Sequence, residues 1–299
     1  MKSKISVVIT AVDGEEKYLP LCLSSVKNIA SEIIIVDMSG GKKITEAAKK
    51  YKAKIFVHEF VNYVEPVRNF GISKATGEWI LILDPDEEIK KELKERLNEI
   101  VENNEADYVR IPRENIVFGK ILHHSRWWPD YNIRFFKKGK VTWDEVIHSV
   151  PMTEGNGIDL EAKNEFAITH HHYETIEQFI ERMNRYTSVQ AKLKAKDYNF
   201  SPHDLIAKPS AEFLSRYFAG QGYRDGIFGF ALSALQAFSE LVVYLKIWQM
   251  QGFKDEEMQI SNVIGEIAKQ KRELNYWEND VIIKENGGII PRIRRKFKV

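Results

Sequence analysis

The chain of 299 residues is 43% hydrophobic and 29% charged, and its 44 basic and 43 acidic residues leave a net charge of +1. This balance lacks the basic excess that is typical of nucleic-acid-binding proteins, so we expect no nucleic-acid partner. A single cysteine, Cys22, excludes an internal disulfide framework and favours a reducing compartment. The N-terminal segment MKSKISVVITAV has too short an apolar run for a signal peptide, and together these features predict a cytoplasmic protein.

Strands and helices alternate regularly over the first hundred residues. Apolar runs predict strands at 4–12, 31–39, 53–60 and 78–84, and segments between and after them predict helices at 15–29, 42–52, 65–76 and 87–103. This order implies right-handed crossovers and a parallel sheet with helices on both faces. Ligands bind beyond the carboxyl ends of such strands, where we expect Asp13, Asp37 and Asp84 to line one edge.

The pattern changes after residue 107. Strands of mixed direction are predicted within 107–118, 132–143 and 165–173, followed by a helix at 175–195. Pro202 and Pro209 indicate a boundary, beyond which the pattern is helical to about residue 285. The sequence therefore predicts an α/β domain over 1–200 and a helical C-terminal region over 201–299. Oligomerisation, acceptor contact and membrane-surface contact all stay open as roles for that region.

The segment LDPDEE places acidic side chains directly after the strand at 78–84. A turn at Pro85 would bring the carboxylates of Asp84 and Asp86 together, and converging carboxylates suit a hard divalent cation such as Mg²⁺ or Mn²⁺. The alternative is that these acids cap the next helix, whose N-terminus favours negative charge. We expect Glu87 and Glu88 to take that capping role.

The helical region contains an apolar stretch at 227–248 that includes Gln236, Glu240 and Lys246. An ionised glutamate in the middle of a membrane span would be costly, so a buried or interfacial helix is the better interpretation. Core packing or a homodimer interface is the default for its aromatic side chains. A peripheral contact at the inner face of the cell membrane is the alternative, supported by the basic residues of the tail, Arg292, Arg294, Arg295, Lys296 and Lys298.

Several segments resemble family 2 glycosyltransferases, which have the GT-A fold, and they occur in the family's order. These are ISVVITAVDGEEKYLPLCLSSV with EIIIVDMS, VEPVRNFGISKATGEWILILDPDEE, WWPDYNIRFFKKGKVTWDEVIHSV, ITHHHYETIEQFIERMNRY and the helical segment from FLSRYFAGQGYRDG. The later segments look like the branch that includes lipopolysaccharide-core glucosyltransferases. The resemblance covers roughly residues 4–250 and implies an α/β GT-A fold, Rossmann-like, with a mainly parallel sheet flanked by helices.

The resemblance also implies roles for individual residues. By matching position, Asp86 and His170 would hold a metal ion, Mn²⁺ or Mg²⁺. The nucleotide sugar would be bound by Thr10, Ala11, Asp13, Asp37, Arg68 and Asp84. The acceptor or sugar would be bound by Trp127, Trp128, Asp130 and Arg134. Two departures affect the nucleotide site: the loop after the first strand is VDGEE, and the turn after the second is MSGGKK.

The catalytic base is left open by a third departure. The family branch has a V-H-E element where this chain has Ile147, His148 and Ser149, and a serine hydroxyl hardly ionises near neutral pH. A base that accepts the acceptor's proton must then come from elsewhere, with Glu145 and His148 as the candidates. Weak or absent activity is the alternative.

The resemblance therefore predicts a metal-dependent inverting glycosyltransferase. It would move a sugar from a nucleotide-diphosphate sugar, expected to be UDP-linked, to a glycan, glycolipid or protein acceptor, including glycans of the cell envelope. A catalytically lapsed nucleotide-sugar-binding or scaffold protein is one alternative. A nucleotidyltransferase is another, although the acidic segment TAVDGEEK stands where that class needs a glycine-rich basic loop.

Overall fold

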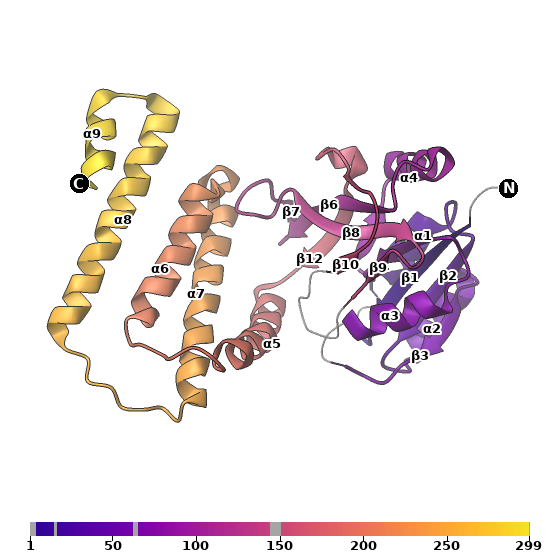
Figure 1. Ribbon diagram of the computed structural model, residues 1–299, viewed down its shortest axis with the longest axis horizontal. Coiled ribbons are helices and arrows are strands. Elements are labelled where there is room, and N and C mark those ends of the chain that lie inside the picture. The colour runs from indigo at the N-terminus through magenta and orange to yellow at the C-terminus, as the bar shows by residue number, and fades with distance from the viewer. Residues whose placement is uncertain (1–3, 15–16, 62–64, 144–150, 299) are drawn as a thin grey trace. The chain divides into compact units, whose positions relative to one another are not determined.

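The computed structural model describes residues 4–14, 17–61, 65–143 and 151–298, and its contacts divide the chain into two compact units (Figure 1). The first unit consists of Met1–Val117 and Trp128–His172, and the second of Phe118–Trp127 and Tyr173–Val299. This division follows residue 172, whereas the sequence-based boundary lies between residues 200 and 201. Helix α5 (Ile176–Lys194) therefore belongs to the helical unit.

One half of the main sheet is parallel, as predicted. Its strands are β1 (Ile5–Ala11), β2 (Glu32–Asp37), β3 (Lys54–Val57) and β4 (Trp79–Leu83), in the order β3-β2-β1-β4. Ala11 is paired with Asp37, so the carboxyl ends of β1 and β2 coincide. The intervening helices are α1 (Leu19–Val26), α2 (Lys42–Lys50) and α3 (Glu65–Lys74). The predicted α/β alternation is confirmed, with strands and helices at the predicted places.

The other half of the sheet contains antiparallel pairs, which confirms the mixed direction expected after residue 107. Strand β8 (Asp130–Lys137) pairs antiparallel with both β4 and β6 (Tyr108–Val117). Beyond β6 lie β12 (Ile168–Tyr173) and β5 (Glu87–Ile89), which also pair antiparallel with each other. The shorter elements of the chain are β7 (Lys120–Ile121), β9 (Val141–Thr142), β10 (Met152–Thr153), β11 (Gly157–Asp159) and a 3₁₀ turn at Asn164–Phe166.

The helix predicted at 87–103 is shorter than expected. Residues 87–89 form strand β5, and helix α4 (Lys91–Asn103) begins only after it, with Lys90 at the N-cap position. The interpretation of Glu87 and Glu88 as caps of that helix is therefore wrong. Both residues lie on a strand because pairing with β12 satisfies their backbone groups, and Glu87 is 1% exposed.

Apolar clusters cover both faces of the sheet. One cluster joins β1, β2 and β4 to α1, α2 and α4, and it includes Cys22, whose burial raises the pKa of its thiol well above the usual value. The other lies on the α3 side, where a Cβ on Gly71 would come within 2.6 Å of Val8 Cγ1. Glycine thus permits α3 to pack closely on β1. The Asn69 side chain further fixes α3 by two hydrogen bonds to the backbone of Trp143, of 2.6 and 3.1 Å.

The second unit is built from helices. Helix α7 (Gly226–Met250) packs against α5 and α6 (Asp204–Leu214), and α8 (Ile260–Asn286) and α9 (Ile289–Phe297) follow it. A π-helical turn (Ser215–Ala219) and a 3₁₀ turn (Gly222–Asp225) connect α6 to α7. Pro209, taken as a boundary signal, lies inside α6.

Helix α7 contains the apolar stretch singled out in the sequence. The turn before α7 and the helix itself, residues 222–250, are together long and apolar enough to cross a membrane. Their most apolar segment of 18 residues has a mean hydropathy of 1.6, and 28% of that segment is buried. Length and composition are the only basis for that possibility. Lys246 of α7 donates hydrogen bonds of 2.7 to 2.8 Å to Asn184, Thr187 and Ser188 of α5. These bonds fix one side of α7 within the unit.

Candidate active site

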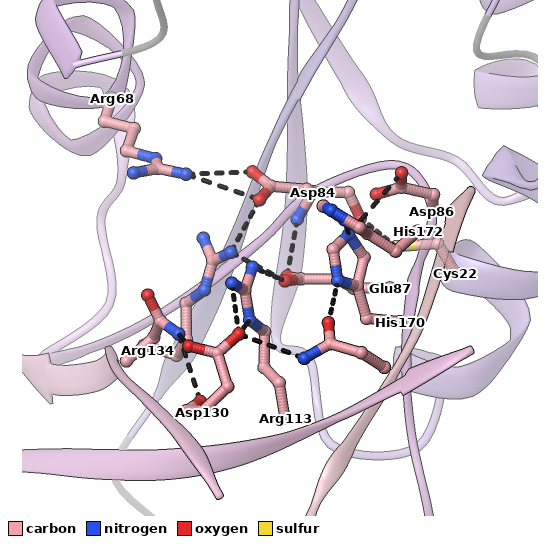
Figure 2. A network of polar contacts seen from close by, with 12 residues as sticks. Cys22, Arg68, Asp84, Asp86, Glu87, Arg113, Asp130, Arg134, His170 and His172 are labelled. Atoms are coloured by element: carbon pink, nitrogen blue, oxygen red, sulfur yellow. Dashed lines mark hydrogen bonds and ion pairs between the residues drawn. The ribbon is translucent and has the colours of Figure 1, made fainter. Parts of the chain in front are cut away.

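A tight turn follows β4 and positions its acidic residues. The backbone N–H of Glu87 donates to the carbonyl of Asp84 at 3.0 Å, with Pro85 at the second position of the turn. The backbone N–H of Asp84 in return donates to Glu87 Oε2 at 2.9 Å. Proline pre-sets the backbone angle that such a turn needs. The turn expected at Pro85 is therefore present, and it brings Asp84, Asp86 and Glu87 to one strand end (Figure 2).

Arginines surround Asp84. Arg68 Nη2 of α3 lies 3.0 Å from Asp84 Oδ1, and Arg134 Nη2 of β8 lies 2.5 Å from Asp84 Oδ2 (Figure 2). Burial would raise the pKa of the Asp84 carboxyl, but the charges of Arg134 and Arg68 outweigh it and hold that pKa well below its usual range. The negative charge of Asp84 is thus offset by arginines of the chain itself.

A bulge in β8 directs Arg134 toward these acids. Val109 of β6 pairs with Phe135, but the next residue, Arg110, pairs with Ile133, so Arg134 is left without a partner in the ladder. A bulge of this kind re-aims the side chain of the extra residue. Arg134 is 2% exposed, and its Nη2 also lies 2.6 Å from Glu87 Oε1.

A third arginine completes the network. Arg113 of β6 lies 3.2 Å from Glu87 Oε1 and 2.6 Å from Asp130 Oδ2. Burial would raise the pKa of the Asp130 carboxyl, but Arg113 outweighs it and lowers that pKa. The three carboxylates of Asp84, Glu87 and Asp130 balance the three guanidinium groups of Arg68, Arg113 and Arg134.

Asp86 and His170 lie together, as expected from the resemblance. His170 Nε2 lies 3.7 Å from Asp86 Oδ2 and 3.2 Å from Nδ1 of His172. The opposite ring nitrogen, Nδ1, donates to Asn115 Oδ1 at 2.6 Å, so in the neutral ring Nε2 is the nitrogen that carries the lone pair. A metal-binding histidine is usually oriented in this way, with its other nitrogen donating to an oxygen. His170 is 4% exposed, so its ring is held in place.

The predicted nucleotide residues lie at the carboxyl ends of β1 and β2. Asp37 is 1% exposed, and its Oδ1 accepts from Ser39 N–H, Ser39 Oγ–H and Gly40 N–H at 2.8, 2.7 and 3.0 Å. The Asp13 backbone N–H donates to Ser39 Oγ at 3.1 Å, which ties the two loops together. Asp37 thus fixes the loop after β2. Thr10 and Ala11 are buried in β1, at 4% and 1% exposure.

The four residues predicted to bind the acceptor or sugar do not all belong to one unit. Trp127 is 9% exposed and belongs to the second unit, while Trp128 belongs to the first and precedes Pro129 through a cis peptide bond. Asp130 and Arg134 are both engaged in the ion-pair network. The candidates for the base, Glu145 and His148, lie outside the described residues.

Sequence reasoning did not single out Glu87, Arg113 or Asn115 as parts of the site. Arg113 and Asn115 are two residues apart on β6, so their side chains share one face, and that face carries the buried Ile111. Polar residues at alternate positions of a half-buried strand were the available signal. Glu87 gave none, because an acid at a helix start is ordinary.

Comparison with known proteins identifies the family. The model of the family described as "Glycosyl transferase family 2" matches residues 6–153. A Rickettsia typhi protein named an uncharacterized glycosyltransferase is 27% identical over 84% of this chain and 88% of its own length. The lipopolysaccharide core biosynthesis glycosyltransferase LpsC of Rhizobium meliloti is 24% identical over 81% of this chain and 91% of its own length.

Solved structures give a more distant likeness. TarS 1–349 of S. aureus, in complex with UDP-GlcNAc, covers 86% of this chain and 94% of its own, with a TM-score of 0.41 and 15% identity. The family assignment rests on the sequence matches. The chain belongs to glycosyl transferase family 2 through residues 6–153, and it is a glycosyltransferase.

Proposed function

We propose that this enzyme is an inverting, divalent-cation-dependent glycosyltransferase. It moves a sugar from a nucleotide-diphosphate sugar, with uridine as the expected nucleoside, to a glycan, glycolipid or protein acceptor. The observation that carries the proposal is the pairing of Asp86 Oδ2 with His170 Nε2, 3.7 Å apart, at the carboxyl end of β4. The relatedness to LpsC, named for lipopolysaccharide core biosynthesis, favours a cell-envelope glycan as the acceptor.

The residues present fit Mn²⁺ or Mg²⁺ held jointly by protein and donor. Among the described residues, no group of three or more His, Cys, Asp or Glu side chains is placed to hold a metal ion by itself. Asp86 and His170 would supply two ligands. Mg²⁺ is commonly bound by one or two carboxylates together with substrate phosphates and water. When bound, the cation would neutralise negative charge that develops on the departing diphosphate.

The arginine network has a separate role in this proposal. Arg68 and Arg134 hold Asp84 ionised and oriented, so the turn that presents Asp86 has a fixed shape. We therefore propose a positioning role for Arg134 in place of the acceptor contact expected from the sequence, because its guanidinium is buried between Asp84 and Glu87.

The nucleotide is proposed to bind at the ends of β1 and β2. Thr10 Oγ1 and Arg68 Nε are buried atoms without a hydrogen-bond partner among the described residues. A buried polar group without a partner costs free energy, and a ligand that supplies one recovers it. Asp37 would contact the ribose or base through Oδ2, since its Oδ1 already accepts three loop bonds. Trp128 and Asp130 remain the proposed contacts of the sugar or acceptor.

A thermal-shift experiment tests donor and metal together. A ligand that binds only the folded state at about 100 times its Kd stabilises by about 2.7 kcal/mol, which raises the Tm of a chain of this size by about 5 °C or more. We expect UDP with Mn²⁺ to produce such a shift and UDP with EDTA to produce a much smaller one. Parallel samples with GDP, CDP and ADP test the base. Equal shifts in Mn²⁺ and EDTA would contradict the metal-bridged site.

The catalytic base is testable by substitution at the two predicted positions. We expect Glu145→Gln or His148→Ala to lower kcat by about 100- to 10,000-fold, the usual contribution of a general base. Donor binding in the thermal-shift assay should be unchanged, because a base acts on the acceptor's proton. Full activity in both variants would remove both residues as candidates, and Ser149→Ala is the neighbouring control.

A further inference from the structure

Helix α9 turns back along α8 at the C-terminal end of the second unit. The connection is Gly287–Gly288, with φ angles of +70° and +109° that glycine adopts without strain. Pro291 lies in the first turn of α9, where its missing N–H leaves no helical bond unmade. The sequence left three roles open for the helical region: core packing, a homodimer interface and contact with a membrane surface. The orientation of α9 bears on the choice among these three.

The apolar side chains of α9 are exposed. Ile289, Ile290, Ile293 and Phe297 are 75, 65, 53 and 64% exposed. Their spacing of one, four and eight residues places all four on one helix face. An amphipathic helix of a soluble protein normally turns such a face toward the core. In α9 the orientation is reversed.

The polar side of α9 packs against α8 instead. Arg295 Nη1 lies 2.6 Å from Asp280 Oδ1, and Lys298 Nζ lies 2.5 Å from Glu273 Oε1. Both cations also lie over the ring of Tyr276, at 5.9 and 5.7 Å from its centroid. Asp280 is 6% exposed, so the pair with Arg295 is largely shielded from solvent. These contacts hold the apolar face outward.

Three further cations of α9 are exposed beside that face. Arg292, Arg294 and Lys296 form no ion pair within the part of the chain that the structure describes. At 100° per residue, Arg294 and Lys296 fall on opposite borders of the apolar face. Long basic side chains at the borders of an apolar stripe are the arrangement of helices that lie in a membrane interface.

We propose that α9 is a membrane-binding helix whose apolar face enters the headgroup region of an anionic lipid surface. Lipid phosphates complement the three unpaired cations, while Arg295 and Lys298 attach the helix to α8. A second copy of the chain fits this face less well, because a symmetric contact would bring two sets of these cations together. The enzyme would thereby be held at a surface where lipid-linked acceptors reside, which is the part of the inference that rests on the proposed function.

Vesicle co-sedimentation of the full chain tests this inference without any nucleotide sugar, so its result is independent of the proposed reaction. We expect binding to vesicles of phosphatidylglycerol mixed with phosphatidylcholine and little binding to phosphatidylcholine alone. Raising the salt from about 0.1 M to about 1 M should weaken it, since the Debye length falls from about 10 to about 3 Å. The triple variant Arg292→Gln/Arg294→Gln/Lys296→Gln should partition about 100-fold more weakly.

Matched variants separate charge, apolar contact and folding. Ile290→Ser/Phe297→Ser should also lose vesicle binding, whereas Lys27→Gln/Lys49→Gln/Lys91→Gln, three exposed lysines of the first unit, should keep it. All variants should keep the wild-type Tm, because the changed side chains are exposed. Absence of binding to anionic vesicles, or binding that persists in both α9 variants, would overturn the proposal. So would a dimer by light scattering that Ile290→Ser/Phe297→Ser dissociates, since a second copy would then cover the face.

Discussion

Replacing Asp86 with alanine is expected to reduce sugar transfer by at least about 100-fold, the range seen when a group that helps to stabilise developing charge in the transition state is removed. The physical reason is specific to this carboxylate. Asp86 Oδ2 lies 3.7 Å from His170 Nε2, so this variant removes the carboxylate of the proposed pair of metal ligands. The measurement is donor hydrolysis or transfer with Mn²⁺ titrated from zero.

Two companion variants sharpen the Asp86 experiment. Asp86→Asn keeps the side-chain volume and removes the charge, so it should resemble Asp86→Ala if charge is what matters. Glu102→Gln, an exposed acid of α4, is the matched control and should keep full activity. His170→Ala removes the second proposed ligand, so sugar transfer by this variant should also fall and should respond less to added Mn²⁺. Unchanged turnover in Asp86→Ala, with a normal Tm, would remove Asp86 from the metal site.

Replacing Arg134 with methionine is expected to destabilise the fold by about 3–5 kcal/mol. Methionine keeps much of the side-chain length, but Asp84 and Glu87 then lose a shared guanidinium partner in a buried setting. Removing one partner of a buried pair leaves an uncompensated charge, which is far more costly than losing an exposed pair. The measurement is the free energy of unfolding from denaturant titration at neutral pH.

An exposed pair in the same sheet provides the control for Arg134. Arg110 on β6 contacts Asp159 by two hydrogen bonds of 2.5 Å, but its side chain is 50% exposed. Arg110→Met should therefore cost only about 0–1 kcal/mol. Arg134→Lys keeps the charge and loses the planar fork, so a large loss there too would show that geometry matters. Equal small losses at both positions would contradict the buried network.

The predicted α/β alternation was confirmed because it depends on local patterns. Runs such as EIIIVD and WILIL are apolar without interruption, as buried parallel strands must be, and the helices between them show their own periodicity. The same reasoning located the turn at Pro85, because proline sets its backbone angle without help from the rest of the fold. It did not find β5, which has three residues and exists only through its pairing with β12.

The composition of the site was predictable only in part. A strand followed by D-P-D predicts a cluster of acids, and the resemblance to the family predicts a metal site at Asp86 and His170, which lie 3.7 Å apart. The partners of Asp84 were not predictable, since Arg68 lies 16 residues before it and Arg134 lies 50 residues after it. Which guanidinium reaches which carboxylate depends on helix packing at Gly71 and on a bulge at Arg134.

Residue types at short spacing were enough to predict the strand–helix order and the acidic strand end, and the resemblance of several ordered segments indicated the family. The arginine partners of Asp84, the burial of Glu87 in the same network and the exposed apolar face of α9 became apparent only in the folded chain. Those outcomes depend on which segments, far apart in the sequence, meet in the fold. An apolar run predicts a buried strand by itself, whereas the role of a charged side chain depends on the groups that surround it in space.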